Sequence, residues 1–172
     1  MVYGRSEMIY STNKKNKKNY IYMEGETLPD GYVFDKLIYE NFIPFPSALI
    51  SKEKFDECGG FSSKYKHALD YCVFLKISNK YKISAIQDVC CKYRIHDNNL
   101  SNFQNVICAL EDIEITKSFF PNKHAINALK HKQLNLSIAY LKESRYLEAL
   151  LHLIRNVKLK IIFDKFLKIF KV

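Results

Sequence analysis

Residues 58–101 constrain the fold of this 172-residue chain more than any other stretch of the sequence. They begin with the pair Gly59-Gly60, which can end a helix and permit a further tight turn. Apolar residues then recur at helical spacing over 70–80, and the segments 83–87 and 89–94 have the composition of two short strands. The stretch therefore predicts a helix followed by strands, as in an α/β fold.

The residues before this stretch predict further short elements. In chain order they are a strand over 1–12, a turn over Leu28–Gly31, a helix over 32–39, a strand over 47–50, and a helix over 52–57 with Ser51 as its N-cap. Phe61, directly after the glycine pair, is expected to anchor the turn in the core. The first hundred residues thus supply the β part of the fold.

From about residue 102 onward only helical patterns occur, and Pro121 marks a break between helices. Two helices are predicted over 124–142 and 146–156. Their expected inward residues are Ile126, Leu129, Leu134, Ile138 and Leu141 on the first helix, and Tyr146, Ala149, Leu150, Leu153 and Ile154 on the second. The pair resembles one helical-repeat hairpin, which cannot bury its own apolar face alone.

The chain is basic, with 27 Lys and Arg against 18 Asp and Glu, a formal charge of +9. Nucleic acid, anionic lipid and phosphate-rich small molecules are the partner classes that fit this charge. The lysine-rich segment 13–19 lacks interleaved aromatic residues and is best interpreted as a solvated loop, so nucleic acid is the weakest of the three.

Over half of the excess charge lies near the C-terminus. Arg155 and five lysines against Asp164 give residues 155–171 a net charge of +5. Residues 157–172 also place six Leu, Ile and Phe side chains at helical spacing. Such a basic amphipathic helix suits an anionic membrane surface, and the alternative is that its apolar face docks on the protein itself.

Five cysteines are present, an odd number without a C-x-x-C pair, which predicts reduced thiols and no zinc site. Arg5 and Glu7 interrupt any apolar core of a signal peptide, and no apolar run approaches the length of a membrane span. We therefore expect a cytoplasmic protein, either free or peripheral on the inner face of the membrane.

Three motifs follow one another within residues 58–101. They are Gly59-Gly60-Phe61, then Asp70-Tyr71, then the nine residues from Tyr93 to Ser101, Tyr-Arg-x-His-x-x-Asn-x-Ser. This order resembles the acceptor-side, C-terminal half of a family 2 glycosyltransferase of the GT-A type. The resemblance implies a partial GT-A body, Rossmann-like and binding nucleotide-diphospho-sugars, over 1–103 and a helical extension over 104–172.

The resemblance also implies roles for individual residues. Asp70 matches the catalytic base, although Leu69 stands where the family usually has Glu. Asp70 has a second reading as a helix N-cap. Arg94, His96 and Ser101 match the segment that closes over the donor diphosphate, with His96 also a candidate metal ligand. Asn99 and Ser101 have the alternative role of capping the following helix.

The family's donor half, with its Asp-x-Asp metal site, has no counterpart here, because no Asp-x-Asp occurs in the sequence. The intact family uses Mn²⁺ or Mg²⁺ and transfers a sugar, with inversion, from a nucleotide-sugar to a hydroxyl of a surface glycan or lipid-linked acceptor. This chain is expected to be an incomplete transferase that is inactive alone, whether as a fragment, a split-gene product or a degenerate copy, and a donor-half polypeptide is a candidate partner. The alternative function is a non-enzymatic interaction or membrane-surface module.

Overall fold

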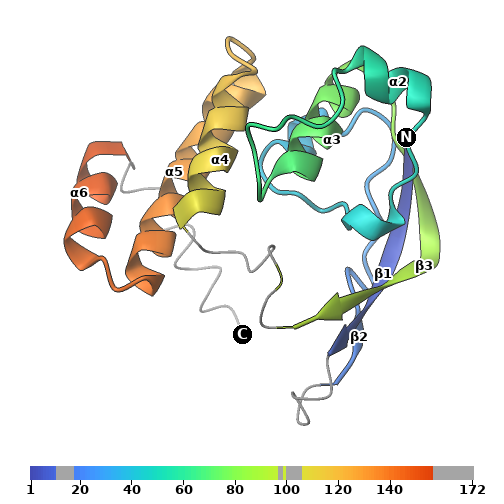
Figure 1. Ribbon diagram of the computed structural model, residues 1–172, viewed down its shortest axis with the longest axis horizontal. Coiled ribbons are helices and arrows are strands. Elements are labelled where there is room, and N and C mark those ends of the chain that lie inside the picture. The colour runs from blue at the N-terminus through green and yellow to red at the C-terminus, as the bar shows by residue number, and fades with distance from the viewer. Residues whose placement is uncertain (11–17, 97–98, 100–105, 157–172) are drawn as a thin grey trace. The chain divides into compact units, whose positions relative to one another are not determined.

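The structure is a computed structural model that describes residues 1–10, 18–96, 99 and 106–156 (Figure 1). It divides into two compact units, Met1–Leu100 and Ser101–Val172, whereas the sequence placed the division after residue 103. The described residues form a mixed three-stranded sheet and six α-helices, which confirms the predicted α/β class.

The sheet belongs to the first unit and has the strand order β2-β1-β3. Its strands are β1 (Val2–Tyr10), β2 (Tyr20–Ile21) and β3 (Ser84–Ile95). β1 pairs antiparallel with β2 and parallel with β3. Because a parallel pair requires a crossover, the chain between β2 and β3 carries the helices of this unit. These are α1 (Phe34–Leu37), the 3₁₀ helix η1 (Phe45–Ser47), α2 (Lys52–Glu57) and α3 (Leu69–Lys80).

β3 is one strand, so the prediction of two strands over 83–87 and 89–94 was wrong. Gly4 is opposite Ile86, whereas the next residue, Arg5, is already opposite Val89. The polar residues between them therefore form an irregularity within the strand and do not end it. A Cβ atom at Gly4 would lie 2.3 Å from the Cys90 sulfur, so β1 needs glycine where the irregularity approaches it.

The predicted strand over 47–50 is also wrong. Phe45–Ser47 form η1, and the Ser47 hydroxyl donates to the Pro44 carbonyl at 2.8 Å. Only Leu49 pairs with the sheet, in an isolated antiparallel bridge to Val2. Pro46 lacks the N–H that a strand would require, which favours the helical turn.

α3 spans nearly the residues that the sequence predicts. Its inward residues Val73, Phe74 and Ile77 are fully buried, as the helical spacing indicates. The buried Tyr71 hydroxyl donates to the Ile38 carbonyl at 2.8 Å and so fastens the first turn of α3 to the end of α1.

The second unit contains α4 (Val106–Lys117), α5 (Lys123–Lys142) and α6 (Tyr146–Asn156). The break at Pro121 and both later helices agree with the prediction. Their inward faces agree only in part. Leu134 and Ala149 are buried as predicted, whereas Ile126, Leu141, Tyr146, Leu150 and Ile154 are all exposed by 43% or more. The buried residues of α5 and α6 are mainly small ones, including Ala125, Ala128, Ala139 and Ala149.

All five cysteines are free thiols. No helix among the described residues is long and apolar enough to cross a membrane. The terminal segment 157–172, for which we predict an amphipathic helix, lies outside the described residues, as do residues 13–17 of the lysine-rich segment.

Candidate functional site

Asp70 lies in the first turn of α3, where a carboxylate is favoured by the positive end of the helix dipole. The N-cap position belongs to Ala68, so the alternative reading of Asp70 as the N-cap is wrong. Oδ1 of Asp70 accepts a hydrogen bond from the Tyr71 amide at 2.8 Å. Asp70 is half-buried, so its carboxylate can contact both the protein and a bound molecule.

Arg94 and His96 lie where β3 ends and the chain turns. Arg94 is exposed and is the second-last residue of the strand, whereas His96 follows the strand and is half-buried. Because β3 stops at Ile95, His96 does not belong to the strand. What relates Arg94 to His96 is the turn that contains them.

Asn99 holds this turn together. Its Nδ2 donates to the Arg94 carbonyl at 3.0 Å, and its Oδ1 accepts a hydrogen bond from the His96 amide. Its amide N–H also donates to the His96 carbonyl at 3.2 Å. Asn99 thus closes the turn after β3, a role different from the alternative of capping the following helix. Ser101 lies outside the described residues.

Residues 81–83 connect α3 to β3, and both candidate groups lie far from that connection. Asp70 is at the beginning of α3, and Arg94 is at the end of β3. The hydrogen bond from Tyr71 to Asp70 and those made by Asn99 are local to their own segments. That Asp70, Arg94 and His96 converge on one cleft remains a prediction.

Phe61 is 47% exposed, so the expectation that it anchors the turn in the core was wrong. The glycine pair before it behaves as predicted, with Gly59 at φ +80° and Gly60 at φ +56° after α2. The second glycine turns the chain outward, and Phe61 packs edge-on against Phe55, with the ring centroids 4.9 Å apart. The turn is therefore anchored by Phe55.

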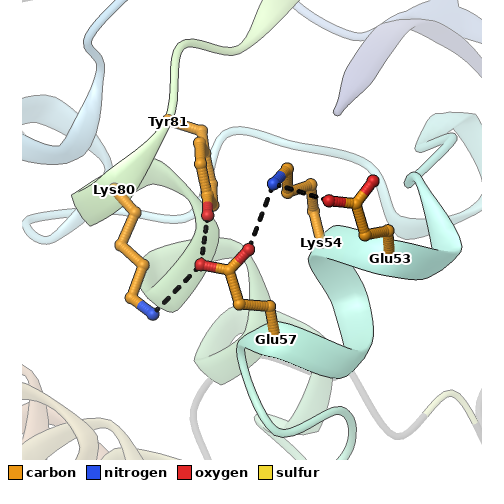
Figure 2. A network of polar contacts seen from close by, with 5 residues as sticks. All are labelled: Glu53, Lys54, Glu57, Lys80 and Tyr81. Atoms are coloured by element: carbon orange, nitrogen blue, oxygen red, sulfur yellow. Dashed lines mark hydrogen bonds and ion pairs between the residues drawn. The ribbon is translucent and has the colours of Figure 1, made fainter.

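A polar network joins α2 to the end of α3 (Figure 2). The Glu57 carboxylate accepts hydrogen bonds from the Tyr81 hydroxyl and from Lys54 Nζ, the latter at 3.1 Å, and Lys80 Nζ lies 3.7 Å away. The bonds from Tyr81 and Lys54 hold the pKa of the Glu57 carboxyl below its usual value. The network is exposed and contributes little stability, and it links α2 to the C-terminal end of α3.

Arg5 on β1 is a second residue that sequence reasoning missed. Its guanidinium donates to the carbonyls of Met23 and Glu26, and its Nε donates to the Gln87 carbonyl at 2.7 Å. The Gln87 side chain in turn accepts from the Leu28 amide at 3.0 Å. Arg5 and Gln87 together fix the loop before Pro29, and these contacts between distant residues left no local signal in the sequence.

Among the described residues, no group of three or more His, Cys, Asp or Glu side chains could hold a metal ion. A scan against protein-family models, a search of curated proteins and a search of solved structures found no match to the chain. Any functional assignment therefore has to come from the residues themselves.

Proposed function

We propose that residues 1–103 are the acceptor-side half of a family 2 glycosyltransferase of the GT-A type. The observation that carries this proposal is the ordered set of motifs, Gly-Gly-Phe, Asp-Tyr and Tyr-Arg-x-His-x-x-Asn-x-Ser. The reaction is transfer of a sugar, with inversion, from a nucleotide-sugar to a hydroxyl of a surface glycan or lipid-linked acceptor.

The topology of the first unit supports the proposal. β1 and β3 are parallel neighbours, and α3 is the last crossover element between them. Ligands of open α/β sheets bind beyond the carboxyl ends of the strands. Arg94 and His96 lie at that end of β3, where a nucleotide diphosphate is expected.

Each candidate residue has chemistry suited to its proposed role. Asp70 takes the proton from the acceptor hydroxyl as general base. Arg94 binds phosphate oxygens with its planar guanidinium, and His96 contacts the diphosphate or the metal ion. A divalent cation, Mn²⁺ or Mg²⁺, neutralises the leaving diphosphate in the intact family. Its remaining ligands would come from a donor half.

The proposal therefore includes a missing partner. This chain alone is expected to bind nucleotide-sugar weakly and to turn it over negligibly, because it contains no Asp-x-Asp. A separate polypeptide carrying the donor half would complete the site. A cytoplasmic location fits the supply of nucleotide-sugars.

The test is sugar transfer measured with Mn²⁺ for the chain alone and for the chain mixed with a donor-half polypeptide. We expect activity only from the mixture, and Asp70→Asn should lower kcat by at least about 100-fold. Asp56→Asn is the matched control, because Asp56 is an exposed carboxylate of α2 that pairs with Lys52. Robust transfer by the isolated chain would contradict the incomplete-site proposal, and an active Asp70→Asn mixture would remove the base assignment.

A second candidate function is a membrane-surface module that uses residues 157–172. The net charge of +5 over 155–171 supports it. Flotation with anionic vesicles should recover the full chain but not residues 1–156, and equal recovery of both would exclude the terminal segment as the membrane contact.

A further inference from the structure

Two neighbouring phenylalanines of the first unit are half-exposed. Phe45 is 48% exposed and Phe61 is 47% exposed, and their ring centroids lie 6.1 Å apart in an edge-to-face arrangement. Phe45 comes from η1 and Phe61 from the loop after the glycine pair, so two distant segments place apolar rings side by side at the surface.

Both rings are held from below by other aromatic side chains. Phe61 packs on Phe55 of α2, and Phe45 lies over the fully buried Phe74 of α3 with the ring centroids 6.3 Å apart. A Cβ atom at Gly60 would lie 3.1 Å from the Phe55 ring, so the glycine makes room for this packing. The exposed pair is therefore preformed, and little side-chain entropy remains to be lost when a ligand binds.

The buried ring beneath the pair also relates it to Asp70. Phe74 is four residues after Asp70 in α3, so the two side chains lie on one face of the helix, one turn apart. Long side chains on a helix lean toward its N-terminus, which brings the Phe74 ring toward the turn that contains Asp70. Phe45, which packs on Phe74, therefore lies against the face of α3 that carries Asp70.

We propose that Phe45 and Phe61 form one wall of an acceptor subsite that binds the C–H face of a pyranose ring. This inference rests on the proposed function, because the assignment of Asp70 as the catalytic base is what makes this surface an acceptor site. A pyranose has an apolar face of C–H groups and a rim of hydroxyls. Rigid aromatic rings against the helix face that carries a half-buried carboxylate match both parts of such a ligand.

The experiment uses the full chain with ¹³C-labelled phenylalanine, observed by NMR. Neutral hexose and amino-sugar oligosaccharides are titrated one by one, and the ring signals of Phe45 and Phe61 are assigned from Phe→Leu variants. We expect one or more oligosaccharides to shift these two signals, and Phe45→Leu to weaken the binding by about fivefold or more. The matched control is Tyr32→Leu, which removes an aromatic ring that is 71% exposed elsewhere on the unit and should leave binding unchanged.

Two results would overturn the subsite. One is a panel in which no oligosaccharide shifts the Phe45 and Phe61 signals, and the other is an alkyl glycoside whose chain, and not its sugar, produces the shifts. Asp70→Asn separates the two proposals, because it should retain oligosaccharide binding while it abolishes transfer. Transfer by the mixture with unaltered acceptor KM in Phe45→Leu would leave the transferase proposal standing and remove the aromatic wall.

Discussion

The two compact units bury different kinds of side chain. In the first unit the fully buried residues are large, among them Tyr3, Phe74, Leu75 and Ile77. In the second unit α5 buries mostly small side chains together with Leu134 and Leu136, and α6 buries Ala149. The residues Leu147, Leu150, Leu151 and Ile154 of α6 are all exposed by 42% or more.

The difference follows from how each core is covered. In the first unit α3 has α1, α2 and η1 to pack on, so its whole apolar stripe is buried. In the second unit α4 and α5 share a small core of Val106, Ile113, Leu136 and Ala139, whereas α6 buries only Ala149 and keeps its large aliphatic residues exposed. Apolar periodicity therefore identifies a helix in both units, but it identifies the buried side chains of α3 better than those of α5 and α6.

The largest expected effect is that of Phe74→Ala in the first unit. Phe74 is fully buried and supports the Phe45 ring, so its truncation should lower the free energy of unfolding by about 3–5 kcal/mol. Urea denaturation read out by hydrogen-exchange mass spectrometry assigns the loss to peptides of residues 1–100. Leu150→Ala removes a leucine of α6 that is 55% exposed and should cost less than 1 kcal/mol, as expected for exposed positions. Equal costs would erase the contrast between the units.

A smaller effect is expected from the ion pair inside the second unit. Lys132 Nζ lies 2.9 Å from Asp112 Oδ2, and the Lys132 side chain is only 3% exposed whereas that of Asp112 is 25% exposed. Asp112→Ala deprives a buried ammonium of this carboxylate and should cost about 3 kcal/mol. Lys132→Met should cost less, because water can reach the carboxylate that remains. The same denaturation measurement, followed in peptides of 106–156, checks this order, and a larger loss in Lys132→Met would reverse the argument.

The sequence predicted much of the first unit because its signals are local. Ser51, Gly59 and the apolar spacing after Asp70 mark the ends and faces of α2 and α3 directly. What it missed depends on residues far apart in the chain. Gly4 is needed only because Cys90 approaches it, and Phe61 is exposed only because Phe55 occupies the space that Gly60 leaves.

The candidate site likewise has features that the sequence predicts and features that depend on residues far apart in the chain. The first-turn position of Asp70 and the strand end at Arg94 could be predicted, since each belongs to a single element. The closing of the turn by Asn99 could not, because Asn favours helix caps and turns alike, and the choice is made by its bonds to Arg94 and His96. The aromatic pair of Phe45 and Phe61 depends on four segments and gave no sequence signal.

The smallest expected effect is a pH dependence confined to the second unit. His152 of α6 lies 2.8 Å, Nδ1 to Oγ, from the buried Ser137 of α5 and packs on the Tyr140 ring. Burial lowers the pKa of His152 below its ordinary value of about 6.5. The unfolded chain therefore binds this proton at a higher pH than the folded chain does. The free energy of unfolding therefore rises with pH across that interval. The contribution of His152 to it is lost as the pH falls below about 6.5.

Because His152 is only half-buried, solvent screens much of this effect, and we expect less than about 1 kcal/mol between pH 7 and pH 5. The measurement compares urea denaturation of the full chain and His152→Gln at both pH values, following peptides of 106–156. Glutamine retains a hydrogen-bonding partner for Ser137 but does not titrate, so subtracting its pH response removes the contribution of the carboxylates. The α5–α6 contact would not disfavour the imidazolium form if the free energy of unfolding changed equally with pH in both proteins. The same conclusion would follow if the full chain became more stable than His152→Gln on acidification.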